Sequence, residues 1–204
     1  RLMQHCSAKK LAMPFATQAA PQQATVQPLY ELFHAWATQT FPNYALTPVP
    51  AFCAGQHYEL QGPTGESNQY VVLPRNRVLS LATHEQDQIQ QWCAIFAVGS
   101  QPVVMADNPF VLKYLAQMPK EISHSLKVIQ HIERDDFDAV LHHGSEQQLQ
   151  LLQRQIAARQ GAIVGITHLK PLQQDIALER LVIERAISIN TAAAGGNASL
   201  MTLT

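Results

Sequence analysis

Residues 77–99 read Arg77-Val-Leu-Ser-Leu-Ala-Thr-His-Glu-Gln-Asp-Gln-Ile-Gln-Gln-Trp-Cys-Ala-Ile-Phe-Ala-Val-Gly99, the pattern of a buried strand that leads directly into a helix. Residues 77–82 are mostly apolar and predict a strand covered on both faces. Thr83 and Gln86 have the spacing of a capping box and predict the helix start, while Gly99 is a suitable helix end. The helix should bury one face made of Ile89, Trp92, Cys93 and Phe96.

The alternation of strand and helix continues downstream. Further strands are predicted at 102–106, 128–132, 137–142 and 162–167. Two helices have clear start signals. The first begins at Asn108-Pro109 and turns Phe110, Val111, Tyr114 and Leu115 inward; the second begins at Ser145 with Gln148, buries Leu149, Leu152 and Ile156, and stops at Gly161. This order implies parallel strands with right-handed crossovers, so the predicted fold class is α/β with a doubly wound, Rossmann-like parallel sheet.

The remaining segments surround this sheet. Residues 1–28 are a predicted leader and linker, because 12–28 are rich in Ala, Gln and Pro. A helix is predicted at 29–40, with an apolar stripe of Leu32, Phe33, Trp36 and Ala37. Short strands at 57–60 and 70–73, separated by the Gly62–Gly65 turn, should form a small β-flap with a long strand at 181–190. The expected organisation is therefore an α/β domain at 29–180, with 57–73 contributing to the flap, then a flap strand at 181–190 and a tail at 191–204.

Composition excludes several classes of protein. The chain has 204 residues, a hydrophobic fraction of 47%, a charged fraction of 14% and a formal net charge of −1. It offers no charge excess for nucleic acid, no apolar run of the roughly 20 residues that span a bilayer, and no apolar core of a signal peptide. Arg1 in place of Met suggests a piece of a longer chain. Cys6, Cys53 and Cys93 are irregularly spaced, which favours reduced thiols and a cytoplasmic location.

Motifs for chemistry are sparse. The phosphate-binding patterns Gly-x-Gly-x-x-Gly and Gly-x-x-x-x-Gly-Lys-Ser/Thr are missing. His142 and His143 are adjacent, and neighbours on a strand point to opposite faces, so they should not chelate one metal ion together. The acidic run 133–138 connects two predicted strands. It is interpreted as a solvated loop, with paired-carboxylate chemistry as the alternative.

The C-terminal tail is the most unusual stretch. Residues 192–196 are small and include the adjacent Gly195 and Gly196, which lose much backbone entropy when they are ordered. An apolar segment, 200–203, nevertheless follows. Two interpretations remain open from the residues alone: a frayed terminus, or a strand that threads a narrow slot in a partner.

The tail also carries a resemblance. Glu184-Arg-Ala-Ile-Ser-Ile-Asn-Thr-Ala-Ala-Ala-Gly-Gly-Asn-Ala-Ser-Leu-Met-Thr202 closely resembles the extreme C-terminus of the long forms of the proline utilization A family. Gly62-Pro-Thr-Gly-Glu-Ser-Asn-Gln-Tyr70 and Leu73-Pro-Arg-Asn-Arg-Val-Leu79 look like the same C-terminal domain. With the order of elements between them, the resemblance covers about residues 28–204.

The middle of the chain resembles the cofactor-binding domain of aldehyde dehydrogenases. Residues 99–107 are similar to its Gly-Asn-Pro-Val-Val-Leu-Lys-Pro strand, but the family lysine that holds the adenosine ribose falls on Ala106. Residues 140–149 are similar to its Phe-Thr-Gly-Ser-x-x-x-Gly turn; Gly144 and Ser145 are retained, whereas the second glycine falls near Leu149. The helix start after Gly144 either attracts an anion or is simply a capped helix. The Gln-His-Cys-Ser-Ala sequence around Cys6 echoes the family's nucleophile motif, but we interpret it as coincidental.

The resemblance implies a non-catalytic C-terminal domain without its own cofactor or metal. The parent would carry FAD in a proline dehydrogenase and NAD in a glutamate-semialdehyde dehydrogenase, with the intermediate passing through a tunnel. The implied partner is the aldehyde dehydrogenase domain of the same polypeptide, against which the flap pairs, and homo-oligomerisation stays open. The implied location is cytoplasmic, compatible with a parent that is peripheral at the inner membrane.

The resemblance also assigns the tunnel-sealing contact to the tail. Its residues are Asn190, Thr191, Ala192, Ala193, Ala194, Gly195, Gly196, Asn197, Ala198, Ser199 and Leu200. Two other classes of function remain as alternatives: a nucleotide-binding enzyme domain with a degenerate cofactor loop, and a stand-alone oligomerisation module.

Overall fold

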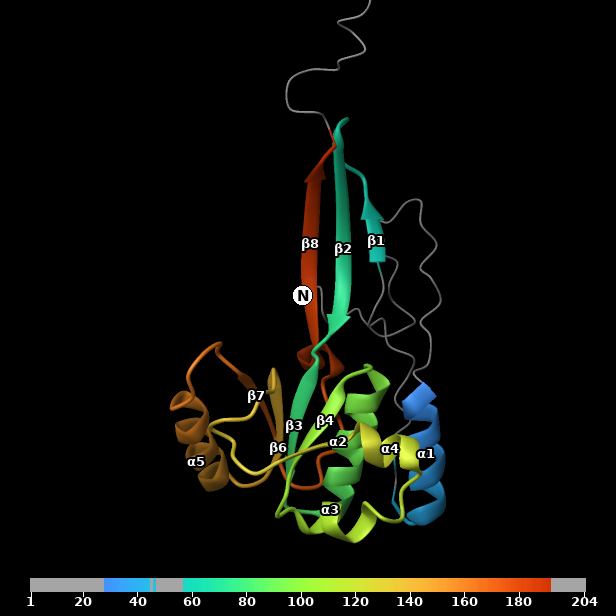
Figure 1. Cartoon of the computed structure of the whole chain (residues 1–204), viewed down its shortest axis with the longest axis vertical. Coiled ribbons are helices and arrows are strands. Elements are labelled where there is room, and N and C mark those ends of the chain that lie inside the picture. Colours follow the sequence, from blue (N-terminus) through green and yellow to red (C-terminus); the bar gives the residue numbers. More distant parts are fainter. Residues whose placement is uncertain (1–27, 45, 47–56, 192–204) are drawn as a thin grey trace, which may run out of the picture.

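The structure, a computed structural model, describes residues 28–44, 46 and 57–191. The predicted leader before residue 28, with Cys6, and the tail beyond Thr191 lie outside the described residues, as does Cys53. Figure 1 shows a helix-covered sheet from which a narrow flap of strands projects.

Five parallel strands form the main sheet. In spatial order they are β5 (Lys127–Ile129), β4 (Gln101–Met105), β3 (Arg77–Ala82), β6 (Ala139–His143) and β7 (Gly165–Leu169). The chain starts at the central strand, moves outward to one edge through β4 and β5, and then returns to build the other edge with β6 and β7. This order confirms the doubly wound parallel sheet.

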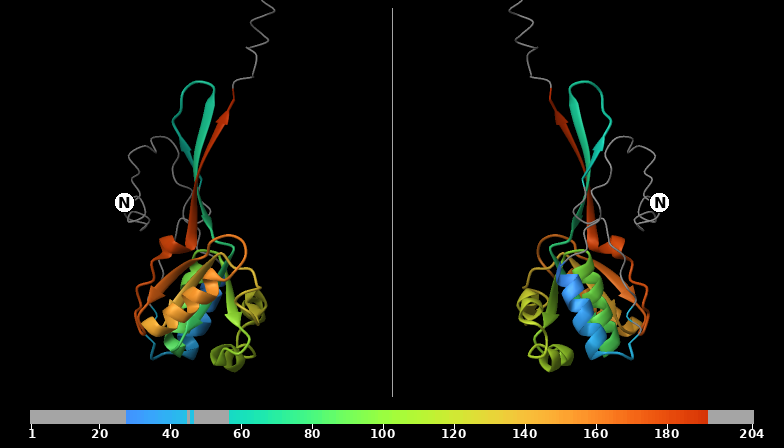
Figure 2. Two further views of the ribbon diagram at one scale, coloured as in Figure 1. Left: turned by 90° about the vertical axis from the view of Figure 1, so that its left-hand side faces the viewer. Right: turned by 90° about the vertical axis from the view of Figure 1, so that its right-hand side faces the viewer.

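Helices cover both faces of the sheet. One face is covered by α2 (Glu85–Ala97), which lies beside α1 (Pro28–Thr40), as both views in Figure 2 show, together with the short helices α3 (Pro109–Tyr114) and α4 (Lys120–Ser125). The other face is covered by α5 (Glu146–Ala157), whose Leu152 packs on Leu79 and Val140. Each face of β3 is therefore closed, which explains its apolar sequence.

The start of α2 differs from the prediction. The helix begins at Glu85, and its N-cap residue is His84, whose side chain makes no capping hydrogen bond. The Thr83–Gln86 capping box was wrong because the Thr83 N–H donates to the carbonyl of His143, 3.3 Å away, and so continues the pairing of β3 with β6. The predicted end at Gly99 is confirmed: Gly99 has a φ of +81°, and its N–H donates to the carbonyl of Phe96.

Other predicted elements agree in type but shift at their ends. The capping box of Ser145 and Gln148 is present, and Asn108 caps α3. Helix α4 had no sequence signal that we recognised. Two residues that were expected to face inward are partly exposed: Leu32 at 37% and Leu115 at 36%. The buried face of α1 consists of Tyr30, Phe33 and Ala37 instead. The buried face of α3 is narrow and consists of Val111 and Tyr114. The shifted strands are β5, predicted at 128–132, β6, predicted at 137–142, and β7, predicted at 162–167.

The flap is a separate antiparallel sheet. It has the order β1 (His57–Leu60), β2 (Glu66–Pro74) and β8 (Val182–Asn190), with β8 preceded by the 3₁₀ helix η2 (Leu178–Leu181). Strand β2 is longer than the predicted 70–73 because it pairs with β8 over its whole length, from Glu66 opposite Asn190 to Pro74 opposite Val182. The predicted pairing of the 57–73 region with the last strand is confirmed.

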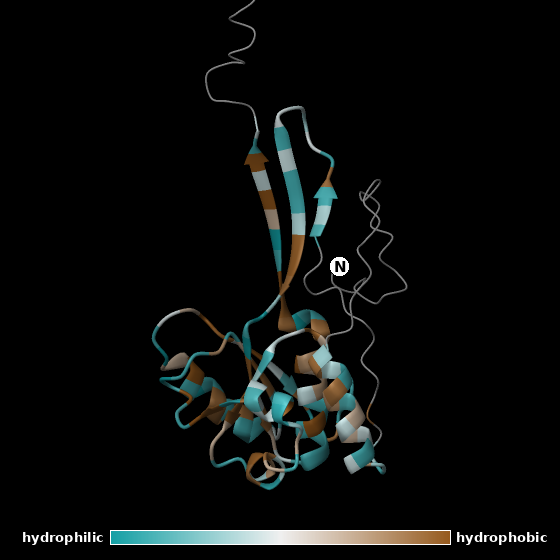
Figure 3. Cartoon of the chain, turned by 45° about the vertical axis from the view of Figure 1, so that its right-hand side comes forward, coloured by the Kyte–Doolittle hydropathy of each residue, from teal (hydrophilic) through white to brown (hydrophobic). Residues whose placement is uncertain are grey.

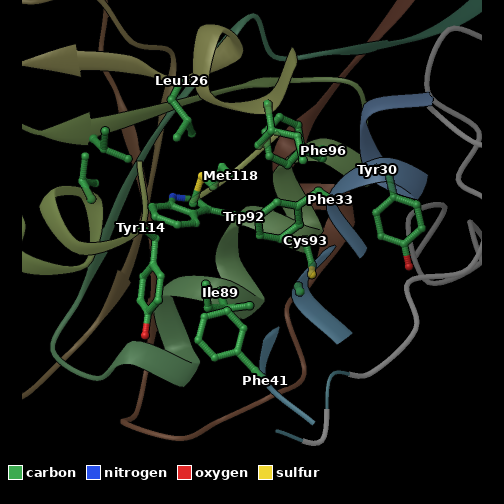
Figure 4. Packing of buried hydrophobic residues seen from close by; sticks show 14 of the residues in the cluster. Tyr30, Phe33, Phe41, Ile89, Trp92, Cys93, Phe96, Tyr114, Met118 and Leu126 are labelled. Carbon is green, nitrogen blue, oxygen red and sulfur yellow. The ribbon is translucent and has the colours of Figure 1, made fainter. Parts of the chain in front are cut away.

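The largest core cluster lies between α1, α2 and the α3–α4 region. Figure 4 shows its aromatic centre, where Trp92 and Phe33 are both fully buried and meet edge to face with ring centroids 6.2 Å apart. The predicted inward face of α2 is confirmed, since Ile89, Trp92, Cys93 and Phe96 all belong to this cluster. The cluster therefore fixes α1 and α2 side by side.

Replacing the central ring tests this arrangement. Trp92→Ala should lower the free energy of unfolding by about 3–5 kcal/mol, as large-to-small core substitutions do. No described residue accepts a hydrogen bond from the buried indole Nε1. Trp92→Phe, the matched control, should therefore cost clearly less than Trp92→Ala, because it keeps a ring and loses no such bond. Chemical denaturation measures both; equal, small effects would contradict the packing.

Candidate functional site: the sheet crevice and the flap edge

A crevice lies at the carboxyl ends of the parallel strands. It has a volume of about 470 Å³ and is bordered by the ends of β3, β4 and β6, the start of α3 and one side of α5. Doubly wound sheets bind ligands at the carboxyl ends of their strands. The binding position lies between the two neighbouring strands from which the chain proceeds in opposite directions across the sheet. Here that position lies between β3 and β6, so the crevice is the place to examine for a cofactor.

The phosphate-binding position of this crevice is already filled by the chain's own side chains. At the start of α5, the Ser145 N–H donates to Oε1 of Gln148 at 2.7 Å, and the Gln148 N–H donates to the Ser145 hydroxyl at 3.3 Å. Gly144 leaves no open space either, since a Cβ there would lie 2.7 Å from both Gln148 Oε1 and His142 Nε2. A pyrophosphate would have to displace the capping box to reach these N–H groups.

Ala106, onto which the family's ribose-binding lysine falls by resemblance, has no side-chain hydrogen-bonding group. Ala106 follows β4 and donates its N–H to the carbonyl of Ile129 at 2.7 Å, and its methyl side chain offers no hydrogen bond. The start of α3 is likewise satisfied, because Asn108 Oδ1 accepts from the N–H groups of Phe110 and Val111. The residues of the crevice therefore do not fit a dinucleotide.

His142 and His168 form a stacked pair beside Gly144. Their Nδ1 atoms are 3.0 Å apart, and their ring centroids are 5.2 Å apart. Burial lowers the pKa of His142 to about 4, with further lowering by the nearby His168 and His143 rings. His168 Nε2 lies 3.5 Å from the Glu146 carboxylate. His142 therefore remains neutral at physiological pH and accepts or donates a hydrogen bond inside the fold rather than binding charge.

His143 points to the other face of β6 and joins a buried hydrogen-bond network. Its Nε2 donates to the carbonyl of Gln173 at 2.8 Å, so its Nδ1 accepts from the Gln91 amide at 2.8 Å. Burial lowers the pKa of His143, although the hydrogen bond to Gln173 opposes this. The two adjacent histidines thus have different partners, as the strand geometry predicted, and among the described residues no group of three His, Cys, Asp or Glu is arranged to hold a metal ion.

The remaining candidates for chemistry have structural surroundings. Cys93 is fully buried in the α1–α2 core, and burial raises the pKa of its thiol to about 12, which removes nucleophilic thiolate at neutral pH. In the acidic run 133–138, Asp138 accepts from the Arg77 N–H at 3.1 Å, and Phe137 is buried. This hydrogen bond ties the end of the run to the start of β3. The run itself contains no strand or α-helix, which agrees with its interpretation as a loop.

The flap presents a free strand edge. In the described residues β8 pairs with β2 on one side and with no strand on the other. Thr191 donates its N–H to the carbonyl of Gly65 at 2.8 Å, which makes Thr191 and Gly65 a hydrogen-bonded pair. Because such pairs alternate in an antiparallel ladder, the even-numbered residues of β8 direct their N–H and C=O groups toward the free edge. Among them are Glu184, Ala186 and Ser188 in the exposed part of the strand.

Three of the odd-numbered residues of β8 are isoleucines, at positions 183, 187 and 189. Figure 3 shows brown bands that recur along β8, and Ile187 and Ile189 are 38% and 51% exposed. A nine-residue strand with an unpaired edge and exposed isoleucines is a surface that soluble proteins normally cover. Of the predicted tail contacts, Asn190 ends this strand and Thr191 follows it, whereas residues 192–200 lie outside the described part of the chain.

Comparison with curated proteins agrees with this architecture. The bifunctional protein PutA of Escherichia coli K12 is 45% identical over 152 residues, which cover 74% of this chain and 11% of that protein. The bifunctional protein PutA of Rhizobium meliloti is 30% identical over 155 residues, covering 73% of this chain and 13% of that protein.

The chain is homologous to a segment of PutA. It spans only about a tenth of the length of the PutA relatives it matches. No protein-family profile matches the chain.

Solved structures with a similar arrangement include PutA and aldehyde dehydrogenases. A Bradyrhizobium japonicum PutA variant aligns with a TM-score of 0.43 and 19% identity over 70% of this chain and 15% of that one. An indole-3-acetaldehyde dehydrogenase aligns with a TM-score of 0.45 and 12% identity over 70% of this chain and 34% of that one.

Within the described residues, no helix is long and apolar enough to cross a membrane.

Several residues around the crevice escaped the sequence analysis. His168, Gln91 and Gln173 occupy positions that a periodicity argument treats as ordinary polar residues. The one available signal was the unusual run of glutamines on the inward side of α2, since polar residues on a buried face need partners. Their partners come from segments up to 52 residues away along the chain, which no local pattern reveals.

The geometry of the crevice leads to a binding prediction. This chain should bind NAD no better than millimolar and should show no aldehyde dehydrogenase activity, because the Ser145–Gln148 box occupies the phosphate position and Ala106 replaces the ribose ligand. Isothermal titration calorimetry with NAD measures the affinity directly. Saturable binding at micromolar NAD would instead favour a nucleotide-binding enzyme domain.

Proposed function

We propose that this chain is the non-catalytic C-terminal domain of a bifunctional proline-catabolic enzyme, and that it acts as a lid on the tunnel between the two active sites. The lid would be attached through the flap, whose free β8 edge pairs with the aldehyde dehydrogenase domain of the same polypeptide. The tail, Asn190–Leu200, would then continue from the paired strand into a slot at the tunnel wall.

The observation that carries this proposal is the free edge of β8. Glu184, Ala186 and Ser188 direct backbone N–H and C=O groups to the side of β8 on which no described strand pairs, and groups of this kind favour the addition of another strand. The exposed Ile187 and Ile189 supply the apolar contact that such an added strand would cover. Pairing along this edge would place the residues after Thr191 directly beside the partner domain.

The state of the crevice supports the absence of catalysis. Its phosphate position is occupied by a capping box, its histidines are bonded within the fold, and Cys93 is fully buried. A domain that keeps the sheet and the flap of an oxidoreductase but fills the cofactor position is suited to packing against a catalytic domain. FAD and NAD would bind elsewhere in the parent protein.

A proline substitution tests the pairing of β8. Ala186 directs its N–H to the free edge, so Ala186→Pro should remove one hydrogen bond to the partner and leave the β2 ladder intact. In the full-length protein we expect weaker docking and roughly two- to tenfold slower coupled NADH formation from proline, since one hydrogen bond is worth about 0.5–1.5 kcal/mol. Proline dehydrogenase activity should be unchanged.

The matched control is Ala186→Val, which keeps the N–H and favours a strand. It should leave coupled NADH formation near the level of the unmodified protein. Equal rates for Ala186→Pro and Ala186→Val would show that the free edge is not paired in the parent and would remove the main support for the lid.

Deletion of the tail tests the seal itself. Removing the chain from Asn190 onward should impair coupled conversion of proline to glutamate and aldehyde oxidation, while proline dehydrogenase activity stays largely intact. Gly195→Trp or Ala193→Trp should imitate the deletion, because a tight slot has no room for a large ring. The lag and rate of NADH production measure this; unchanged coupled kinetics after deletion would identify the tail as a frayed terminus.

A further inference from the structure

A second cavity lies at the opposite ends of the parallel strands from the crevice, where the flap joins the domain. We call it the hinge pocket. Its volume is about 680 Å³, within the range of small-molecule sites. Its walls come from the β2–β3 link, from the loops before β6 and β7, and from Ile183 and Arg185 of β8. It therefore lies at the amino ends of the strands, where doubly wound sheets do not usually bind a cofactor.

The hinge pocket carries an excess of positive charge. Six charged residues line it: Arg75, Arg77, Arg159, Arg185, Asp136 and Asp138. The Asp138 carboxylate is engaged by the Arg77 N–H, and the Asp136 carboxylate is 85% exposed and 3.7 Å from the Arg77 guanidinium. An ion pair so exposed and so long is weak, and the two carboxylates balance at most two of the four guanidinium charges. The four guanidinium groups are thus incompletely compensated, in a chain whose formal net charge is −1.

Two of the arginines are held in place by the fold. Arg75 donates from Nε to the carbonyl of Arg180 at 3.1 Å and from Nη1 to the carbonyl of Asp138 at 3.3 Å. Arg159 stacks on the Phe137 ring, 4.1 Å from its centroid, and donates to the carbonyl of Ile132. A guanidinium has five N–H donors, so each keeps donors beyond those bonds. Their positions are therefore fixed before any ligand arrives, which lowers the entropic cost of binding.

Arg185 differs from the other three arginines. It belongs to the flap, on the exposed part of β8, and its guanidinium forms no hydrogen bond or ion pair with any described residue. Ile183 and Arg185 are two residues apart on the strand and so face the same side, toward the pocket. A ligand held by Arg75 or Arg159 on the domain and by Arg185 on the flap would connect the two parts of the molecule.

We propose that the hinge pocket binds a small organic anion with two carboxylate groups, and that binding restrains the flap against the domain. Guanidinium groups match carboxylates by paired N–H donors, and two separated carboxylates can engage the domain and flap arginines together. A single carboxylate would satisfy one side alone. This inference does not depend on the proposed lid function, since it concerns the 204-residue chain alone.

The first experiment is calorimetry with glutarate as the probe, with propionate and inorganic phosphate as comparison anions, at constant ionic strength. Glutarate should bind with a dissociation constant at or below about 1 mM, and propionate should bind at least about tenfold more weakly. Phosphate binding as tight as glutarate binding would overturn the dicarboxylate assignment. The absence of saturable heat with glutarate would overturn the site.

The second experiment uses variants. Arg185→Gln should weaken glutarate binding by about tenfold, because it removes the flap's guanidinium. Arg154→Gln is the matched control: Arg154 is an exposed arginine on α5 and does not line the pocket, so its replacement should change the affinity less than twofold. Thermal melting confirms that both variants fold. Equal effects of the two substitutions would show that glutarate senses only the overall charge and would contradict the proposal.

Amide NMR then locates the ligand and tests the restraint. Glutarate should shift the signals of residues 75–77, 159–164 and 183–185 and should slow hydrogen exchange at the base of β8. Shifts confined to the start of α5, around Gly144 and Ser145, would place the anion in the crevice and overturn the hinge-pocket site. If amide hydrogen exchange in β8 stays unchanged when the pocket is saturated with glutarate, the proposed restraint of the flap is wrong.

Discussion

The fold depends on the need of its central strand to satisfy one buried polar side chain. Strand β3 is hydrogen-bonded along both edges and covered on both faces, and Ser80 in its middle is fully buried. Its hydroxyl donates to Gln91 Oε1 at 2.5 Å and accepts from the Gln88 amide. Leaving such a group without partners costs about 1–3 kcal/mol, so the turn of α2 that carries Gln88 and Gln91 must lie against β3 in one register.

This network extends to both ends of the crevice. Asn108 donates to Gln88 Oε1 at 2.8 Å on one side, and on the other side the chain passes through Gln91 and His143 to the carbonyl of Gln173. Every link has one donor and one acceptor, so the network fixes α3, β6 and the β7–η2 connection relative to β3. Asn108 and His143, which border the crevice, are thereby engaged in hydrogen bonds within the fold.

Much of the fold was predictable because its signals are local. The apolar strand 77–82, the left-handed Gly99 and the Ser145–Gln148 box each depend on residues within a few positions, and all three are confirmed. The Thr83 cap was wrong because a long-range bond to His143 competed for its backbone. Long-range contacts also explain two other misses. Pairing with β8 sets the length of β2, and packing against α2 decides which side of α1 is buried, so that Leu32 is exposed. Of the candidate site, the sequence located the flap strand, whereas the partners of His142 and His143 required the assembled sheet.

The sequence by itself therefore determined the order of strands and helices apart from α4, the doubly wound class and the similarity to a segment of PutA, because periodicity, caps and motifs are properties of neighbouring residues. Tertiary structure decided which polar groups satisfy one another. Gln91 meets His143 across 52 positions, and Arg75, Arg159 and Arg185 gather at one pocket from three distant segments. Burial makes such meetings energetically decisive, since water no longer supplies alternative partners, yet burial is known only once the chain has folded.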